Sequence, residues 1–214
     1  MAARGELAYL YKGRLYLNLT NRCPTACRFC AKHAWDWNYR GSRLLLGREP
    51  TVGELLDAAR CRLPDAPSRE IIFCGFGEPT ERLATLLDLS EALRSGQPGL
   101  SLRLNTVGLG TLSNRRDIVP ELAAVLDSVS VSLNTADAAQ WRFLHRPRAN
   151  LAAAGFCAVC DFIRGCVQAK LETTVTAVEQ PGVDLAAVAA LSRRLGAGFR
   201  LRPQLVDRPQ RAGS

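Results

Sequence analysis

The sequence contains no run of apolar residues that approaches the ~20 needed to cross a membrane. Its opening residues, MAARGELAYLYKGR, also lack the sustained apolar segment of a secretory leader. These two absences favour a cytoplasmic protein in a reducing compartment over a membrane or secreted protein. The eight cysteines then indicate metal or redox sites rather than a framework of disulfide bonds.

Lysine is also scarce, since Lys12, Lys32 and Lys170 are the only ones. The net charge of +8 is therefore carried almost entirely by arginine. A basic protein can bind nucleic acid or an anionic substrate. However, the arginines are scattered along the chain, and they are adjacent only at 115–116 and 193–194. This dispersion favours a solvated basic surface, and nucleic acid is an open but less favoured partner.

A chain of 214 residues with 47% apolar residues corresponds to about one domain with a sizeable core. Strand and helix patterns alternate about six times along it, which predicts an α/β fold with a parallel sheet and right-handed crossovers. A closed eight-unit barrel usually needs ~250 residues, so a partial (β/α)6 barrel fits the length better. We expect the barrel to span residues 1–203 and residues 204–214 to form a flexible tail.

The expected elements follow from apolar periodicity. Residues 32–50 hold aromatic and charged side chains among glycines, and they are predicted to form a loop that is either a lid over a site or a cover for one barrel end. Strands are predicted at 7–19, 70–74, 100–105, 128–133, 170–177 and 199–202. Helices are predicted at 51–61, 79–94, 115–126, 137–144, 150–165 and 184–195.

Residues 18–30 read NLTNRCPTACRFC and place Cys23, Cys27 and Cys30 at the spacing CxxxCxxC. Thiolates are soft ligands, and a compact loop of three suits zinc or an iron–sulfur cluster. Because most clusters take four cysteines, three leave one metal position open for a substrate or cofactor. Phe29 precedes the third cysteine and is expected to shield the site from water.

This motif, after a first strand and with an aromatic residue before the third cysteine, resembles the signature of the radical S-adenosylmethionine (SAM) superfamily. The resemblance implies that Cys23, Cys27 and Cys30 hold three irons of a [4Fe–4S] cluster and that the open iron binds the amino and carboxylate groups of SAM. The order NLTNRCP, FCGFGEPT, RLNTVG, SVSLN and FRLRP is similar to one branch, the TatD-associated radical SAM proteins.

The resemblance also implies an activity. A one-electron donor of the flavodoxin or ferredoxin type reduces the cluster, which cleaves SAM to methionine and a 5′-deoxyadenosyl radical. The radical abstracts hydrogen from a substrate that the sequence does not identify, and the enzyme is expected to be oxygen-sensitive. Because a six-unit barrel leaves its side open, we expect a substrate that is small or presented by a partner. No catalytic residue is assigned beyond the cofactor ligands.

Gly75, Phe76, Gly77, Glu78 and Pro79 follow an apolar strand. They resemble the GGEP motif of the superfamily, with Phe76 at the first glycine. Glycines let a backbone approach a ligand closely, and Glu78 with neighbouring carbonyls could accept hydrogen bonds from the SAM ammonium. The alternative is an ordinary strand-to-helix turn in which Glu78 caps the helix.

Later strands also end in polar residues. Asn105 lies in NTVG, which resembles the TNG-type turn of the superfamily but has Val107 at the usual asparagine. Strand alternation puts Ser132 and Asn134 on one face. The resemblance implies that these residues contact the ribose or carboxylate of SAM. Arg200 of the last strand could hold a SAM carboxylate or an acidic substrate. The polar face of strand 170–177 could line the substrate cavity, although an outward solvated face is the alternative for the last two strands.

The other cysteines favour core positions over an auxiliary cluster. Cys157, Cys160 and Cys166 lie in a segment with helical periodicity, and Cys61 and Cys74 are also expected in the core. His145, at the end of a predicted helix, is either an acid or base group or a partly exposed turn residue.

Two other classes of protein remain open. One is a zinc or iron–sulfur binding module without SAM chemistry, in which His33 could complete a zinc site. The other acts on nucleic acid, and its binding would weaken steeply with salt.

Overall fold

The computed structural model describes residues 5–204, without the side chain of His33. These residues form two compact units. The first contains 5–23 and 30–102, and the second contains 24–29 and 103–204. Of the predicted tail at 204–214, all but Gln204 lies outside the described residues.

The first unit is built on three strands in the order β1-β2-β5. Strand β1 (Ala8–Tyr11) pairs antiparallel with β2 (Arg14–Leu17), and β2 pairs parallel with β5 (Glu70–Phe73). The hairpin turn places Lys12 and Gly13 at φ values of 49° and 71°, as a two-residue turn of this hand requires. Ile71, Ile72 and Phe73 are all fully buried, which explains the continuous apolar run of β5.

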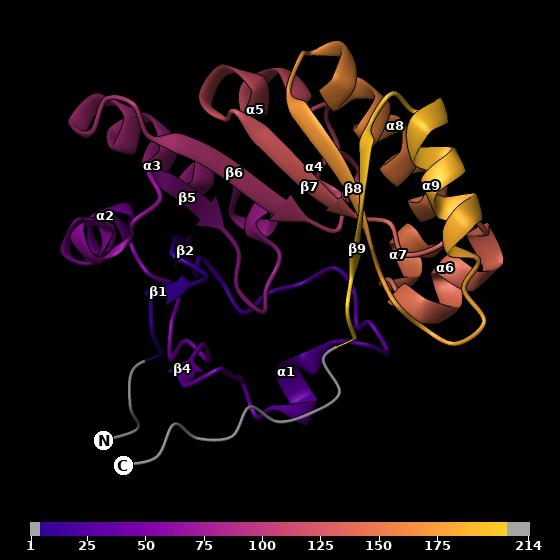
Figure 1. The fold of residues 1–214 in the computed structure, drawn as a ribbon, viewed down its shortest axis with the longest axis horizontal. Coiled ribbons are helices and arrows are strands. Elements are labelled where there is room, and N and C mark those ends of the chain that lie inside the picture. The colour runs from indigo at the N-terminus through magenta and orange to yellow at the C-terminus, as the bar shows by residue number, and fades with distance from the viewer. Residues whose placement is uncertain (1–4, 205–214) are drawn as a thin grey trace. The chain divides into compact units, whose positions relative to one another are not determined.

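Helices complete the first unit (Figure 1). Helix α2 (Val52–Arg62) begins with a capping box between Thr51 and Glu54 and packs against β1, β2 and α3 (Leu83–Gly96). Short 3-10 turns lie at η1 (Leu63–Asp65) and η2 (Pro79–Arg82). The predicted loop 32–50 contains the hairpin of β3 (Asn38–Tyr39) and β4 (Ser42–Arg43) and follows the start of α1 (Ala31–Ala34).

The second unit has its strands in the order β6-β7-β8-β9. Strands β6 (Ser101–Thr106), β7 (Ser128–Ser132), β8 (Glu172–Val178) and β9 (Gly198–Arg202) pair in parallel. Helix α8 (Gly155–Gln168) packs against β8, and α9 (Leu185–Arg194) packs against β8 and β9 (Figure 1). The remaining helices are α4 (Gly110–Asn114), α5 (Val119–Val125), α6 (Ala138–His145) and α7 (Ala149–Ala152).

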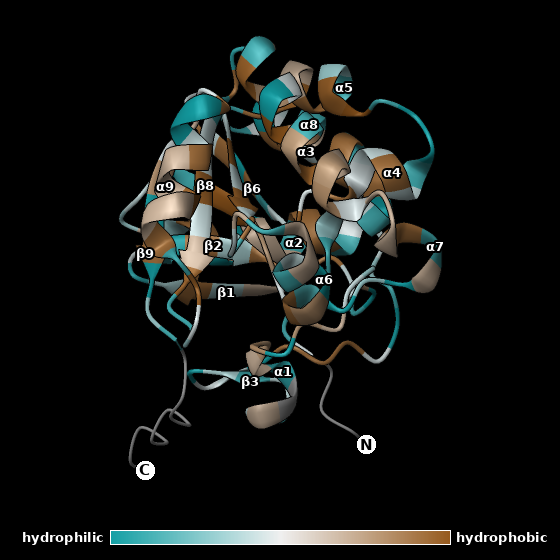
Figure 2. Cartoon of the chain, turned by 90° about the vertical axis from the view of Figure 1, so that its right-hand side faces the viewer, coloured by the Kyte–Doolittle hydropathy of each residue, from teal (hydrophilic) through white to brown (hydrophobic). Residues whose placement is uncertain are grey.

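The two faces of this sheet differ in polarity. Val129, Val131 and Val175 are buried on one face. Figure 2 shows apolar residues along β6, and it shows both polar and apolar residues on helix α9. The register aligns polar residues on the other face. One row is Asn105, Ser130 and Thr174, and the next is Ser132, Thr176 and Arg200.

The prediction of an α/β fold with a mostly parallel sheet is confirmed. Two predicted helices are wrong in their extent. The helix predicted at 115–126 is shorter, because it begins at α5, which Pro120 opens. The preceding stretch, predicted as a turn, contains the short helix α4, which ends where Arg115 adopts a left-handed φ of 56°. The helix at 150–165 is divided into α7 and α8. Within residues 5–204, no helix has the length and apolarity of a membrane span.

Candidate cluster and cofactor site

The three cysteines of the CxxxCxxC loop form no disulfide bond and are half-buried. Cys23 and Cys30 belong to the first unit, and Cys27 belongs to the second. Among the side chains described for residues 5–204, no three His, Cys, Asp or Glu groups are placed to hold a single metal ion. A [4Fe–4S] cluster has a different requirement, because each cysteine binds a different iron.

In the first unit, the segment that leads to Cys23 lies against the GFGEP turn. Glu78 donates its backbone N–H to the carbonyl of Arg22 at 2.8 Å. A Cβ atom at Gly77 would lie 2.0 Å from the carbonyl oxygen of Thr20. The sequence predicted that the glycines of this turn let a ligand come close to the backbone. In the structure, what comes close to Gly77 is the protein's own backbone, at the start of the CxxxCxxC loop of residues 18–30, here called the cluster loop.

Glu78 is 2% exposed, and its carboxylate caps the 3-10 turn η2. Its Oε1 accepts hydrogen bonds from the backbone N–H of Thr80 at 3.1 Å and from the Thr80 hydroxyl at 2.8 Å. The helix-capping alternative is thus confirmed. Contact between Glu78 and a SAM ammonium stays a prediction, because one carboxylate can accept several hydrogen bonds.

Phe76, which stands at the first glycine of the motif, has an aromatic environment. Its ring centroid lies 6.0 Å from that of Trp37 and 6.3 Å from that of Tyr39, both in edge-to-face geometry. Tyr39 in turn contacts Tyr9 and Trp35. Phe76, in place of a glycine, therefore packs the GFGEP turn against the β3–β4 hairpin and the residue before it. Such aromatic pairs contribute stability beyond the area that they bury.

Glu49, which sequence reasoning missed, fixes the start of the cluster loop. Its Oε1 accepts a hydrogen bond from the Thr20 hydroxyl at 2.8 Å and lies 3.5 Å from Nε of Arg22. Its Oε2 lies 3.0 Å from Nε of Arg82, which also donates to the carbonyl of Leu19 at 3.1 Å. No local pattern marks this residue, because its partners are distant in the sequence.

In the second unit, Cys27 lies on a short segment bound to the end of α6. The backbone N–H of Ala26 donates to the carbonyl of His145 at 3.1 Å, and that of Arg28 donates to the carbonyl of Leu144 at 2.8 Å. The sulfur of Cys27 lies 3.3 Å from the Thr25 hydroxyl and 3.6 Å from Nδ1 of His145. This cysteine therefore has a defined polar environment.

His145 is fully buried, so of the two alternatives for this residue the partly exposed turn residue is wrong. Burial lowers its pKa to about 4, and the imidazole is neutral at pH 7. Its ring stacks on Trp141 at 5.0 Å and meets the edge of Phe29 at 5.4 Å. One sequence signal could have indicated this burial, because His145 is one helical turn after the apolar Trp141.

Asn134 is also fully buried and adopts a left-handed φ of 65°. Its Oδ1 accepts a hydrogen bond from the backbone N–H of Val178 at 2.8 Å, and its Nδ2 lies 3.1 Å from Nε2 of His145. The protein itself therefore engages both polar groups of this side chain, which the sequence predicted to contact SAM.

The polar face of the second unit brings together the other predicted residues. The Oδ1 atom of Asn105 is buried without a hydrogen-bond partner among the described residues. Ser132 Oγ lies 3.5 Å from Thr176 Oγ1, and Arg200 donates to Ser130 Oγ at 3.1 Å. A buried acceptor without a donor is costly, so this face is suited to a ligand that carries hydroxyl or amino groups.

The remaining cysteines divide into two groups. Cys160 and Cys166 are buried as predicted, and burial raises the pKa of their thiols to about 11 and about 12. Cys61 and Cys157 are exposed, so their predicted core positions are wrong. Cys74 is half-buried.

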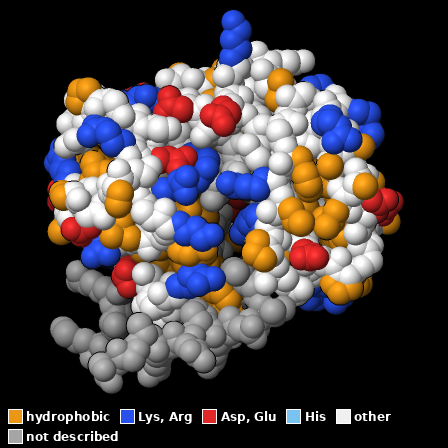
Figure 3. All heavy atoms as spheres, viewed as in Figure 1, with side chains coloured by type: hydrophobic (Ala, Val, Ile, Leu, Met, Phe, Trp, Pro, Cys, Tyr) orange, Lys and Arg blue, Asp and Glu red, His pale blue; other side chains and the backbone are white. Residues whose placement is uncertain are grey.

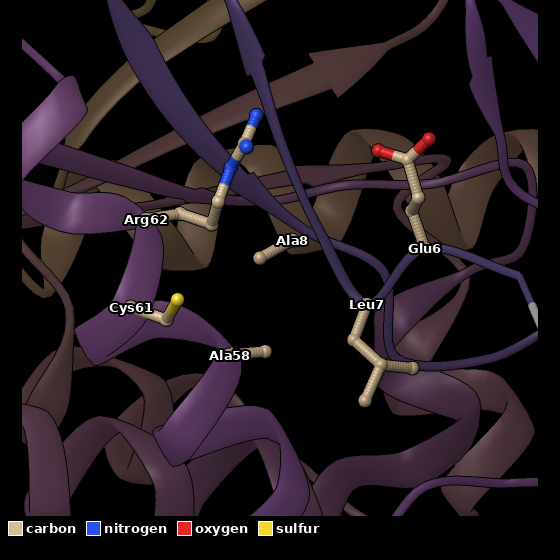
Figure 4. A pocket seen from close by; sticks show the side chains of 6 residues that line it. All are labelled: Glu6, Leu7, Ala8, Ala58, Cys61 and Arg62. Carbon is tan, nitrogen blue, oxygen red and sulfur yellow. The ribbon is translucent and has the colours of Figure 1, made fainter.

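A shallow hollow of about 390 Å³ lies elsewhere in the first unit, between the start of β1 and the end of α2 (Figure 4). It contains none of the predicted site residues. Its lining consists of Glu6, Leu7, Ala8, Ala58, Cys61 and Arg62.

Comparison with known proteins shows which family the chain belongs to. Residues 17–195 match the profile of the Radical SAM superfamily. The chain belongs to the radical SAM superfamily. It is 31% identical over 191 residues to a GTP 3',8-cyclase from Mycobacterium sp. (strain KMS). That match covers 88% of this chain and 50% of the cyclase, so the chain spans about half the length of these curated relatives.

Solved protein structures share the fold of this chain at low sequence identity. SuiB from Streptococcus suis, bound to its precursor peptide SuiA, matches with a TM-score of 0.64 and 15% identity, over 88% of this chain and 38% of SuiB. The hydrogenase maturase HydG from Carboxydothermus hydrogenoformans matches with a TM-score of 0.64 and 15% identity, over 94% of this chain and 46% of HydG. The resemblance to the TatD-associated branch stays a prediction.

The residues present fit the cofactors of this family, a [4Fe–4S] cluster and SAM. Three cysteines that form no disulfide bond offer soft thiolates, the ligands that iron–sulfur clusters take. The buried Oδ1 of Asn105 offers an acceptor to a ligand hydroxyl. Membership of the radical SAM superfamily favours an enzyme that uses SAM over a metal-binding module without SAM chemistry.

Proposed function

We propose that this chain is a radical SAM enzyme that acts on a substrate still to be identified. The observation that carries the proposal is the family match across residues 17–195, which includes three free cysteines at CxxxCxxC spacing. When bound, the cluster supplies the electron that cleaves SAM to methionine and a 5′-deoxyadenosyl radical, which abstracts hydrogen from the substrate.

The protein's own residues position these groups. Cys23, Cys27 and Cys30 would each bind one iron, which leaves the fourth iron to the amino and carboxylate groups of SAM. Glu78 and the carbonyls of residues 75–77 would accept hydrogen bonds from the SAM ammonium.

The polar sheet face would hold the rest of SAM. Asn105 and Ser132 would face the ribose hydroxyls, and Arg200 would pair with a carboxylate. Because the protein engages both polar groups of Asn134, we assign that residue to holding the end of β7 rather than to direct SAM contact.

Similar proteins and the polar residues of the sheet indicate which classes of substrate to test. One relative is a GTP cyclase and one structural neighbour is bound to a peptide, so both small anions and presented chains occur among similar proteins. The polar face of β8, with Thr174 and Thr176, is available to line a substrate cavity. Figure 3 shows lysine and arginine side chains in separate groups on the face in view, with acidic side chains among them. The scatter of the arginines along the chain favours a dispersed positive field over a nucleic-acid footprint.

The experiment that tests the function is anaerobic. The protein is reconstituted with iron and sulfide, reduced with dithionite and given SAM, and 5′-deoxyadenosine is measured by chromatography. We expect the product to form in proportion to the cluster content. A fully loaded and reduced protein that leaves SAM intact, and whose cluster EPR signal does not change on SAM addition, would contradict the proposal.

We further propose that an acidic one-electron donor of the flavodoxin or ferredoxin type docks on the surface around Cys27. Arg28, Arg142, Arg146 and Arg148 are exposed there, on the two segments that the backbone hydrogen bonds join. Phe143 is 58% exposed, and the Arg28 guanidinium lies 3.9 Å from its ring centroid. Positive charge around an exposed aromatic ring suits a negatively charged partner. A donor that functions in a reducing compartment would place the enzyme in the cytoplasm, consistent with its free cysteines.

Charge reversal on this surface should slow reduction by an acidic donor. We expect Arg142→Glu with Arg148→Glu to reduce the rate with flavodoxin by about tenfold at low salt, and the difference should shrink as salt screens the charges. Arg193→Glu with Arg194→Glu on α9 makes the same charge change and serves as the control. If both double variants lose the same fraction of the reduction rate with flavodoxin, the donor docks elsewhere. Reduction by dithionite, which needs no docking surface, should be unchanged in both variants.

A further inference from the structure

The ring of His145 is held in one position beside the sulfur of Cys27. Its Nδ1 lies 3.6 Å from that sulfur, within reach of a hydrogen bond to sulfur. Trp141 stacks on the ring at an interplanar angle of 19°, and Phe29 meets it at 85°. The carbonyl of His145 accepts from the N–H of Ala26, so the same residue binds both the backbone and the side chain of the cluster loop.

The opposite nitrogen of the ring is controlled by Asn134. The backbone N–H of Val178 can only donate, and it lies 2.8 Å from the amide oxygen of Asn134. This fixes the orientation of the amide, so its Nδ2 faces Nε2 of His145 at 3.1 Å. An amide nitrogen is a donor, so Nε2 is the acceptor in a hydrogen bond with Asn134. A neutral imidazole that accepts at Nε2 carries its hydrogen on Nδ1.

The alternative tautomer of His145, with its hydrogen on Nε2, fits only when the Cys27 thiol is protonated. The carbonyl of Leu133 lies 3.3 Å from Nε2 and would accept from an Nε2–H group, and Nδ1 would then accept from the thiol of Cys27. An iron-bound thiolate has no hydrogen to donate, and a lone pair on Nδ1 would face its negative charge. Loading of the cluster therefore favours the tautomer with hydrogen on Nδ1.

We propose that His145 is a positioning residue for the cluster, which donates a hydrogen bond from Nδ1 to the Cys27 thiolate in the tautomer set by Asn134. The proposal rests on the proposed function, in which Cys27 binds iron. A hydrogen bond to a cluster sulfur withdraws negative charge from it and raises the reduction potential. His145 would thus ease the one-electron reduction on which SAM cleavage depends.

The test compares reduction potentials of reconstituted holoenzymes. His145→Phe keeps a flat aromatic ring in the buried position but has no donor. We expect this variant to keep its iron and to show about a tenfold lower ratio of reduced to oxidised cluster at a fixed applied potential, equal to a shift of about 59 mV for one electron. His145→Asn keeps an amide nitrogen near the position of Nδ1 and should recover part of the potential. Cys157→Ala, at an exposed position on α8, is the control and should keep the wild-type potential.

A spectroscopic signature separates this role from a packing role. His33 and His145 are the chain's only histidines, so labelling histidine with a heavy nitrogen isotope adds few signals. Pulsed EPR of the reduced cluster should show coupling to a histidine nitrogen in the wild type, and His145→Phe should remove it. This signal tests the proposal even where His145→Phe fails to load iron, and its absence from the wild type overturns the proposal.

The remaining outcomes are also decisive. A loaded His145→Phe protein with the wild-type potential overturns the role of His145 and leaves the proposed function intact. A loaded wild-type protein with the expected potentials that does not cleave SAM contradicts the function alone. A wild-type protein that takes up no iron overturns both.

Discussion

Replacement of Cys23, Cys27 or Cys30 by alanine is expected to abolish cluster binding and SAM cleavage. Each variant removes one of the three proposed iron ligands on a single loop, and no other cysteine belongs to that loop. Loss of a residue that merely orients a metal ligand typically costs about 10–100-fold in metal affinity or activity, so loss of a ligand should cost more than about 100-fold. Iron content, visible absorbance and 5′-deoxyadenosine formation measure the effect.

The matched control uses a cysteine outside the loop. Cys157 is exposed on α8, and Cys157→Ala should keep the iron content and SAM cleavage of the wild type. A loop variant that loads and cleaves SAM like Cys157→Ala would remove that cysteine from the ligand set. Far-ultraviolet circular dichroism of each variant would show that the fold is retained.

Gly77→Ala is expected to destabilise the protein and displace the cluster loop. The new Cβ would lie 2.0 Å from the carbonyl oxygen of Thr20 and 2.8 Å from that of Arg22. Both atoms are backbone and cannot rotate away, so the segment that leads to Cys23 must move. Overpacking of this kind costs about 3 kcal/mol or somewhat more in the free energy of unfolding, which lowers Tm by roughly 6–12 °C for a chain of this size. Thermal unfolding of the cluster-free protein measures the shift.

Gly47→Ala provides the control for this substitution. A Cβ atom at Gly47 would have no other heavy atom within 4 Å, and Gly47 lies in the same unit of the fold. Its Tm should change by only a few degrees, because the only effect expected is a small loss of backbone entropy in the unfolded chain. Equal stability of Gly77→Ala and the wild type would show that Thr20 does not approach Gly77 in solution.

The sequence by itself determined the fold class and the family. Alternation of strand and helix patterns predicted a mostly parallel α/β sheet, because a strand buried on both sides, such as β5, reads as a continuous apolar run. The spacing of Cys23, Cys27 and Cys30 indicated a loop that could hold a cluster, since all three proposed ligands lie within one short segment. These signals are local, and a sequence displays local patterns directly.

The tertiary structure alone decided what surrounds that loop. Cys27 and His145 are 118 positions apart, and Asn134 reaches Val178 across 44. Gly77 is required as glycine because a distant carbonyl approaches it, although its motif suggested space for a ligand. The sequence placed His145 at a helix end, and its position one helical turn after Trp141 was the one local signal of its burial. Contacts between segments distant in the chain depend on how strands and helices pack, and this packing leaves no repeating pattern in the sequence that could reveal a hydrogen bond to a single sulfur.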